Sequence, residues 1–152
     1  FFNRTCFTAG GKSYTLNNIE HNILRKDFGD PRIHTAINCA SGGCPRLERK
    51  AFLPEDLDDR LEASMRFFIR ESRNVRIDRK KNLVALSKIF DWFEEDFTGW
   101  HERTYGSEDA KITDYLTLYL PEADGAYLKQ NREVDVHHVD YDWMLNDQAL
   151  NK

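Results

Sequence analysis

The sequence lacks long hydrophobic runs, an excess of positive charge and an even number of cysteines. Each absence argues against a class of protein. No uninterrupted apolar stretch approaches the roughly 20 residues that a membrane-spanning helix needs, so we expect no membrane span. The formal net charge of −4 gives no general attraction to nucleic acid or to anionic membranes. The cysteines are three, Cys6, Cys39 and Cys44, which leaves at least one thiol free unless it pairs with another chain.

The amino-acid composition of the chain is that of an ordinary globular domain. Of its 152 residues, 32% are charged and 40% are hydrophobic, which is enough to bury a core. We find no internal repeat and no linker, so we expect residues 1–152 to form a single domain. Because the chain opens on Phe1-Phe2 without a methionine or a signal-peptide pattern, we expect it to be a processed or truncated piece.

The first part of the chain predicts a hairpin, a helix and a strand. Short β-type segments flank a Gly-Gly turn within residues 5–16, which is typical of a hairpin. Asn17 and Glu20 have the spacing of a helix N-cap and capping box, and Gly29-Asp30-Pro31 ends that helix. Alternation over residues 32–39 then predicts a central strand, on which we expect the Glu20 helix to pack.

The rest of the chain predicts further helices around a second hairpin. Apolar residues recur at helical spacing after Pro54, residues 75–86 predict the hairpin, and Ser87 and Ser107 have the character of helix N-caps. Alternation over residues 134–141 predicts a last strand. We expect the acidic residues after Ser87 to face water: Asp91, Glu94, Glu95 and Asp96. The expected fold is α+β, a small mixed or antiparallel sheet packed with several helices.

The stretch from Cys39 to Pro45 gathers small, polar and sulfur-bearing residues. Such residues at the end of a strand suit a binding or catalytic site, because they let a ligand approach the backbone and its N–H groups. We predict that the groups binding substrate or an oxyanion are Asn38, Ser41, Gly42 and Gly43. The other interpretation is a connector whose cysteines are a small core residue and half of a disulfide, and a bridge between Cys39 and Cys44 is possible in an oxidising compartment.

One hypothesis is a thiol enzyme, a hydrolase or acyltransferase acting on an amide or a thioester. Cys39 or Cys44 would be the nucleophile. His34 or His21 would act as the base, and Glu20 would orient it. In a regular strand His34 and Cys39 point to opposite faces. His34 therefore reaches Cys39 only if the strand bends, and otherwise His21 or Cys44 must serve.

Two other hypotheses use the same residues. The first is a metal site whose ligands are His21, His34, Cys39 and Cys44, with Glu20 as an additional candidate; these groups suit zinc, although Cys-x4-Cys is not a strong zinc spacing. The second is a non-catalytic protein-binding module in which Glu20 and His34 form a buried structural pair. No cofactor is expected for the thiol enzyme, and its ligand is a small molecule or a peptide that the sequence does not identify.

Five segments carry a family resemblance: residues 16–25, 30–34, 38–45, 86–93 and 141–146. The first contains the Glu-His pair, and the third contains the Asn-Cys-Ala-Ser run followed by Cys-Pro. Together they are similar to domain-of-unknown-function family 547, which is found in bacteria and, in diverged form, in plants. The similarity extends over nearly the whole chain.

The resemblance implies a location and a missing segment, but no activity. Members of the family carry a helical segment rich in Trp, Asn and Tyr ahead of the hairpin, so this chain is expected to begin after it. Many bacterial members look exported, which implies a periplasmic or extracellular location. The biochemical activity of the family is not settled, so the resemblance adds neither substrate nor mechanism.

Overall fold

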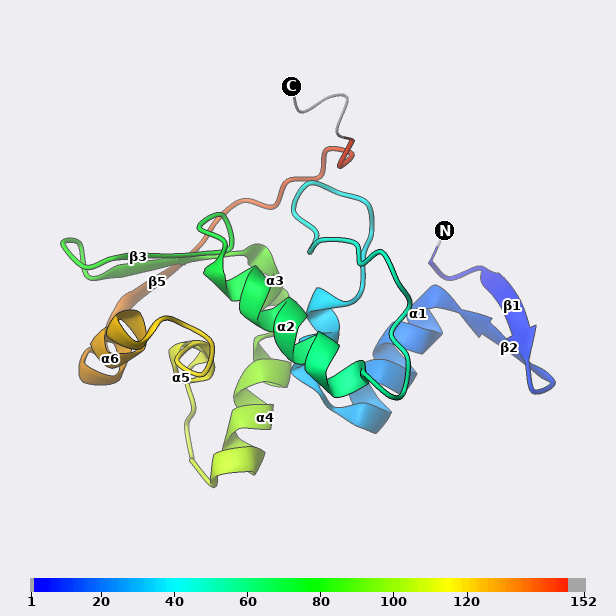
Figure 1. The fold of residues 1–152 in the computed structure, drawn as a ribbon, viewed down its shortest axis with the longest axis horizontal. Coiled ribbons are helices and arrows are strands. Elements are labelled where there is room, and N and C mark those ends of the chain that lie inside the picture. The colour runs from blue at the N-terminus through cyan, green and yellow to red at the C-terminus, as the bar shows by residue number, and fades with distance from the viewer. Residues whose placement is uncertain (1, 148–152) are drawn as a thin grey trace.

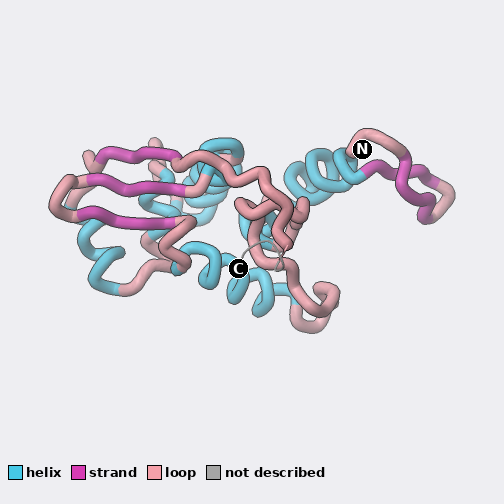
Figure 2. The backbone as a smooth tube through the Cα atoms, turned by 90° about the horizontal axis from the view of Figure 1, so that it is seen from above, coloured by secondary structure: helices cyan, strands magenta, loops and turns pink. Residues whose placement is uncertain are grey.

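The structure, a computed structural model, describes residues 2–147 and has the expected α+β fold. An N-terminal hairpin lies at one end of the molecule and a three-stranded sheet at the other, with most of the helices between them (Figure 1). Seen from above, the hairpin and the helix that follows it extend away from the body of the domain (Figure 2).

The N-terminal hairpin confirms the first prediction. Strands β1 (Thr5–Ala9) and β2 (Lys12–Thr15) pair antiparallel. Gly10 and Gly11 form the turn with φ of 56° and 75°. Glycine adopts this left-handed conformation at little cost, which is why a Gly-Gly pair stands here.

The helix after the hairpin starts earlier than predicted and is wound more loosely. It consists of α1 (Leu16–Asn18) and a π-helical segment, η1 (Ile19–Phe28). The N-cap is Thr15, whose Oγ1 accepts from the Asn18 N–H at 2.9 Å, so the predicted Asn17 cap is wrong. Thr15 has the extended conformation that a cap requires, whereas Asn17 is already helical. As predicted, the helix ends at Gly29.

The predicted central strand over residues 32–39 is wrong. Residues Pro31–Thr35 form a 3-10 helix, η2, and an irregular segment follows. The Asp30 carboxylate caps it by accepting from the Arg32 N–H at 2.9 Å, and Pro31 occupies the first helical position. Four of its five residues are buried, which explains why their sequence resembles a buried strand.

The remaining helices agree with the prediction in part. They are α2 (Leu57–Arg70), α3 (Lys88–Trp92), α4 (Glu94–Tyr105), α5 (Ile112–Leu116) and α6 (Glu122–Gln130). The helix expected after Ser87 is divided into two, α3 and α4, and α6 lies where no helix was predicted. Ser87 caps α3 as predicted, with its hydroxyl accepting from the Ile89 N–H at 3.3 Å. The predicted Ser107 cap is wrong, because α5 begins after Lys111, where Asp114 accepts from the Lys111 N–H at 2.9 Å.

The larger sheet is mixed. Strands β3 (Val75–Asp78) and β4 (Leu83–Leu86) form the predicted antiparallel hairpin, and β5 (Asp135–His138) joins β4 in parallel. The last strand is thus shorter than the predicted 134–141, and the chain continues from it toward the cysteine loop. The three strands lie side by side in Figure 2.

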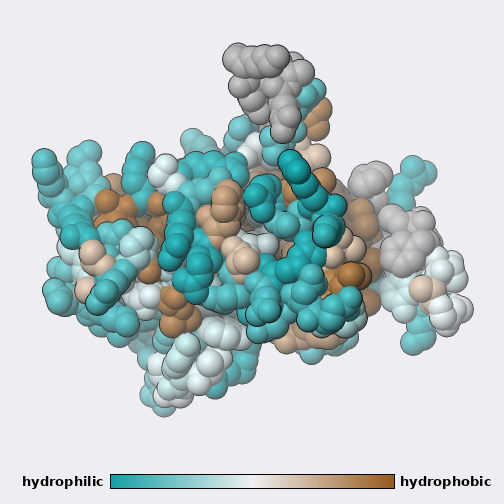
Figure 3. Space-filling view, in the orientation of Figure 1, coloured by the Kyte–Doolittle hydropathy of each residue, from teal (hydrophilic) through white to brown (hydrophobic). Residues whose placement is uncertain are grey.

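The core lies between the helices and the mixed sheet. Its most enclosed large side chains are Met65, Phe68, Phe90, Phe97 and Tyr115. Burying each of these contributes roughly 1.5–3 kcal/mol relative to exposure. On the face shown in Figure 3, hydrophilic side chains cover most of the surface, with hydrophobic patches between them. Within residues 2–147 no helix has the length and apolar character needed to cross a bilayer.

Candidate functional site

A cavity of about 270 Å³ gathers all five residues that the sequence proposed for thiol chemistry. Glu20 and His21 reach it from η1, His34 from η2, and Cys39 and Cys44 from the loop that follows. Aromatic side chains complete the wall: Phe2, Trp92, Phe93 and Tyr141. The cavity therefore combines two thiols, two imidazoles and a carboxylate with an apolar lining, as small-ligand sites commonly do.

The loop from Cys39 to Pro45 is folded by its own polar groups. The Asn38 side chain accepts from the Ala40 N–H at 2.7 Å and donates to the Pro45 carbonyl at 2.6 Å. The Cys44 N–H donates to the Ser41 carbonyl at 3.1 Å and closes the turn. Both ends of the Asn38 amide are used in shaping the loop, although it was expected to bind substrate.

The two glycines of the loop are needed for a close approach of the C-terminal segment. Gly42 N–H donates to the Met144 carbonyl at 2.7 Å, and Gly43 N–H donates to the Asp142 carbonyl at 2.9 Å. These N–H groups, predicted to bind an oxyanion, are therefore occupied. A Cβ atom at Gly43 would lie 2.6 Å from Cε2 of Tyr141, closer than packed atoms approach.

The approach of the C-terminal segment brings a second hydroxyl to the thiols. Tyr141 OH lies 2.8 Å from Ser41 Oγ, and both hydroxyls donate to Cys44 Sγ, at 3.3 and 3.4 Å. The Cys39 N–H also donates to this sulfur, at 3.0 Å. Cys39 Sγ lies 3.2 Å from Ser41 Oγ and 3.5 Å from Tyr141 OH. Both cysteines are free; Cys39 is exposed, and Cys44 is buried, with 3% of its surface accessible.

These donors determine the acidity of Cys44. Burial alone would raise the pKa of the thiol, because it disfavours the charged form. Hydrogen bonds from Cys39, Ser41 and Tyr141 outweigh burial and lower the pKa to about 7. The Tyr141 pKa is raised by burial and by its sulfur neighbours, so its hydroxyl stays protonated and remains a donor.

His34 has a carboxylate partner, but it is Asp96 rather than the predicted Glu20. Its Nε2 lies 2.7 Å from Asp96 Oδ2. Because a carboxylate only accepts, Nε2 donates this hydrogen bond. Arg25 also holds Asp96: its Nε donates to the same Oδ2 at 2.6 Å, and its Nη2 donates to Oδ1 at 3.0 Å. Partial burial would raise the Asp96 pKa, but the bonds from His34 and Arg25 hold it well below its usual range.

The His34 ring is held by two aromatic contacts as well as by Asp96. It stacks on Phe93 with ring centroids 4.0 Å apart and contacts Phe97 at 5.5 Å. Nδ1 is buried and has no hydrogen-bond partner among the described residues. An imidazole held by a carboxylate with its other nitrogen unused is the arrangement of a general base.

Glu20 and His21 border the cavity in other roles. Glu20 is half-buried, and within residues 2–147 it makes no hydrogen bond to His34. His21 Nδ1 accepts from Arg25 at 3.1 Å. Of the described residues, no three His, Cys, Asp or Glu side chains form a group that could hold a metal ion, so the four residues of the metal hypothesis do not converge in that way.

Sequence reasoning missed Asp96 and Tyr141. Asp96 was assigned to water, yet it lies three residues after Phe93 and four before Trp100, a spacing that places it on the aromatic face of α4. That spacing was the available signal. Tyr141 was read as part of a strand, and nothing in the sequence indicates that it meets residues a hundred positions earlier.

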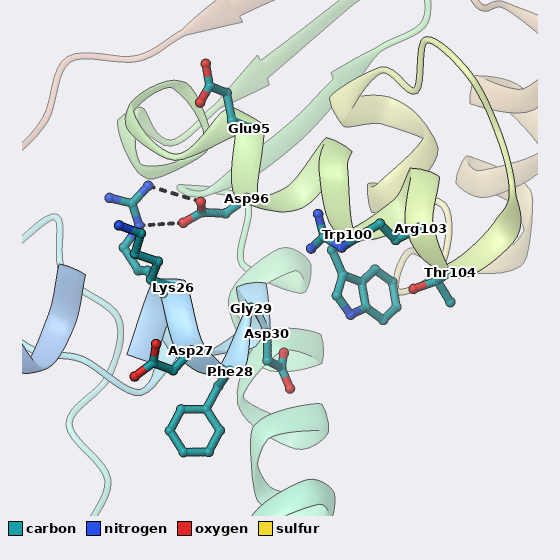
Figure 4. A pocket seen from close by; sticks show the side chains of 11 residues that line it. Lys26, Asp27, Phe28, Gly29, Asp30, Glu95, Asp96, Trp100, Arg103 and Thr104 are labelled. Carbon is teal, nitrogen blue, oxygen red and sulfur yellow. Dashed lines mark hydrogen bonds and ion pairs between the residues drawn. The ribbon is translucent and has the colours of Figure 1, made fainter. Parts of the chain in front are cut away.

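A larger cleft of about 640 Å³ lies on the other side of the Arg25–Asp96 pair. Its lining mixes both signs of charge: Lys26 and Arg103 stand against Asp27, Asp30 and Glu95. In Figure 4, dashed lines show Asp96 bonded across the top of this cleft, with Trp100 and Arg103 on the neighbouring turn of α4. Asp96 therefore connects this cleft to the wall of the thiol cavity.

Comparison with known families agrees with the resemblance found in the sequence. Residues 1–69 match the model of a family described as "Protein of unknown function, DUF547". The matched part contains Glu20, His21, His34, Cys39 and Cys44, whereas Asp96 and Tyr141 lie beyond it. No curated protein and no solved structure matches the chain. The chain is thus a domain of unknown function with an α+β fold.

Proposed function

We propose that this domain is a thiol enzyme that transfers acyl groups from a thioester or an amide, with Cys44 as its nucleophile. The observation that carries the proposal is the set of donors converging on Cys44 Sγ: two hydroxyls and one backbone N–H, all within 3.4 Å. A pKa of about 7 leaves about half of the thiol ionised at neutral pH. A thiol with a pKa near the ambient pH is close to optimal, since a lower value also weakens the nucleophile.

The chemical step uses this thiolate directly. Cys44 Sγ attacks the carbonyl carbon, and the carbonyl π electrons move to oxygen. The tetrahedral intermediate collapses by expelling a thiolate or an amine and leaves an acyl group on sulfur. Water then releases the acid, or a second nucleophile accepts the acyl group. The polar groups nearest to the reacting sulfur are the Cys39 N–H at 3.0 Å and the hydroxyls of Tyr141 and Ser41 at 3.3 and 3.4 Å.

His34 supplies the proton transfers in this proposal. An amine leaving group must gain a proton, and an attacking water must lose one. The unused Nδ1 of His34 belongs to a residue that lines the cavity. Asp96 holds the opposite nitrogen and stabilises the imidazolium that forms. Asp96 thereby takes the positioning role that the sequence suggested for Glu20.

The experiment is acylation of the native protein by an aryl thioester, followed by mass spectrometry of the peptides. We expect one acyl group on Cys44, with the Cys39→Ser variant still acylated and Cys44→Ser unmodified. The His34→Ala variant should form the adduct but hydrolyse it more slowly. Absence of the adduct, or equal labelling of native and urea-unfolded chains, would contradict the proposal.

A second candidate is a protein-binding module, which is favoured by an aromatic cluster beside the cavity. Trp92, Tyr141 and Trp143 have ring centroids 4.6–5.7 Å apart. Trp143 is 71% exposed, and Met144 and Leu145 beside it are also exposed. Exposed aromatic and Met side chains are enriched at interfaces. Such a module needs no reactive thiol, so Cys44→Ser would leave its binding unchanged.

A further inference from the structure

We propose that Cys39 and Cys44 form a dithiol that exchanges with small-molecule disulfides and closes a reversible Cys39–Cys44 disulfide. This activity uses the same loop as the proposed acyl transfer but does not depend on it. It requires only that the two sulfurs meet, that one is accessible, and that the other is ready to displace a leaving group.

The two sulfurs lie against the same pair of hydroxyls. Ser41 Oγ is 3.2 Å from Cys39 Sγ and 3.4 Å from Cys44 Sγ, and Tyr141 OH is 3.5 and 3.3 Å from them. The backbone N–H of Cys39 also points at Cys44 Sγ, 3.0 Å away. The side chains therefore converge on one point, as a disulfide between residues at the two ends of a turn requires.

Burial assigns the order of the two steps. Cys39 is exposed and can meet a bulky disulfide. Cys44 is 3% accessible and borders the cavity, which admits a narrow group such as a planar carbonyl more readily than a disulfide flanked by two bulky substituents. Cys39 is therefore the attacking thiol, and Cys44 is the resolving thiol. The donors that favour the Cys44 thiolate make it ready for the second step. The other titratable side chains that line the cavity are Glu20, His21, His34 and Tyr141.

Both steps balance with glutathione disulfide as the oxidant. Cys39 loses its proton to solvent, and its sulfur attacks one sulfur of glutathione disulfide, which expels one glutathione thiolate. The Cys44 thiolate then attacks Cys39 Sγ and expels the second glutathione. The protein loses two protons and two electrons, and glutathione disulfide takes them up to form two molecules of glutathione. The disulfide-bonded loop has no free thiolate, so oxidation also blocks any chemistry at Cys44.

The test uses the full chain carrying Cys6→Ser, so that only the loop thiols react. This protein is incubated with glutathione disulfide, quenched in acid and mapped by mass spectrometry. We expect loss of two hydrogens, a Cys39–Cys44 peptide bridge and full reversal by reduced glutathione. Adding Cys44→Ser should trap glutathione on Cys39. Adding Cys39→Ser should slow glutathione uptake at least about tenfold relative to Cys44→Ser, because Cys44 is buried.

Each contrary outcome is distinct from failure of acyl transfer, which is measured on the reduced protein. Lasting glutathione on Cys39 without the bridge would show that the sulfurs do not meet. Equal rates for the two single-thiol proteins would overturn the order of the steps. Bridge formation only in urea would assign it to the unfolded chain.

A tyrosine variant separates a specific role of the hydroxyl from a structural one. Tyr141→Phe removes one donor from Cys44, so the pH midpoint of the resolving step should rise by about one unit. Tyr127 is the control, since its hydroxyl bonds to Asn82 at 2.9 Å far from the loop in sequence. Tyr127→Phe should leave the midpoint unchanged. An unchanged midpoint in Tyr141→Phe would remove this hydroxyl from the mechanism.

Discussion

At the scale of single residues, Cys44 shows how hydrogen bonds can outweigh burial. A buried thiol normally has a raised pKa and is inert. Here Ser41, Tyr141 and the Cys39 backbone all donate to the sulfur. The Ser41 and Tyr141 hydroxyls each have one proton, so both can donate to the sulfur only when neither donates to the other. This arrangement is most favourable when the sulfur is a thiolate, because hydrogen bonds to a charged acceptor are stronger.

Replacing Ser41 should therefore change the acidity of Cys44. In Ser41→Ala we expect the pH midpoint of Cys44 alkylation to rise from about 7 by roughly one unit, since one donor to the thiolate is lost. The rate at Cys44 is followed by tandem mass spectrometry of its peptide after iodoacetamide treatment across pH 5–10, in the Cys6→Ser background that keeps the Cys39 side chain beside Cys44. The exposed Ser72→Ala variant is the control. A midpoint that stays near 7 in Ser41→Ala would show that this hydroxyl does not stabilise the thiolate.

Replacing Asp96, which lies outside the apolar core, should lower the free energy of unfolding. Asp96→Asn removes the charge that holds both His34 and Arg25, and we expect a loss of ~1–3 kcal/mol in the free energy of unfolding at pH 7. Folding lowers the Asp96 pKa from 3.8, so its contribution is present above about pH 4 and declines as the pH falls further. Urea unfolding at pH 7 and pH 3 should thus show a difference between wild type and variant that shrinks in acid.

Two neighbouring substitutions give the controls for Asp96. Glu95→Gln changes the same charge at an exposed position one residue earlier. Glu20→Ala removes the carboxylate that the sequence placed on His34. Both should stay within ~0.5 kcal/mol of wild type. A loss in Glu20→Ala as large as that in Asp96→Asn would restore Glu20 as the partner of the imidazole.

At the scale of elements, the thiol loop depends on the segment that follows β5. Residues 142–146 run along the loop and bond to it at three places, through Gly42, Gly43 and Asn146. Arg73, which precedes β3, adds a bond to the Gly42 carbonyl at 2.6 Å. The position of Tyr141 over the sulfurs is thus determined by backbone contacts.

Adding a methyl group to Gly43 should displace Tyr141 from the thiols. The new Cβ would lie 2.6 Å from the tyrosine ring, so Gly43→Ala should lose ~1–3 kcal/mol of stability by overpacking and should also raise the Cys44 alkylation midpoint. Gly125→Ala on α6 is the control, because its nearest contact is 3.4 Å and alanine suits a helix. A destabilised Gly43→Ala with an unchanged midpoint would mean that the ring moves without losing its hydrogen bond.

Helices and strands whose turn or cap residues are adjacent in the sequence could be predicted from it. Elements that lack such neighbouring residues could not. The Gly-Gly hairpin, the Ser87 cap and the β3–β4 hairpin are encoded by adjacent residues. The predicted strand over residues 32–39 was wrong, because a short segment with mostly buried residues has a similar sequence pattern whether its backbone is a strand or a 3-10 helix. The Asp30-Pro31 pair was the sign of a capped helical start.

The candidate site was predictable to the same extent. Its five sequence-proposed residues do line one cavity, because they lie within one short stretch of chain. Their partners come from distant elements: Asp96 from α4 and Tyr141 from the C-terminal segment. No spacing rule connects such positions, so the pairing of His34 with Asp96 and of the thiols with Tyr141 required the structure.

At the scale of the whole molecule, the site joins two parts of the chain that the core keeps in place. The buried members of the core cluster lie between Met65 and Val134. The family match ends at residue 69, so it contains the thiols, Ser41 and the Cys39 N–H, whereas Tyr141 and Asp96 lie beyond it. The chemistry of the matched segment thus depends in part on groups outside it.

Removing residues 140–152 should separate the stability of the core from the chemistry of the thiols. The core cluster and β5 remain, so we expect cooperative thermal unfolding with a Tm lowered by no more than about 5 °C. Tyr141 and the contacts of residues 142–146 to the loop are lost, so the midpoint of Cys44 alkylation should rise by at least the one unit or so expected for Tyr141→Phe. A chain lacking only residues 148–152, which lie outside the described residues, is the control and should keep the midpoint near 7. If the longer truncation abolishes cooperative unfolding, the C-terminal segment belongs to the folding unit itself; if the midpoint stays near 7, the donors that tune Cys44 come from within the loop.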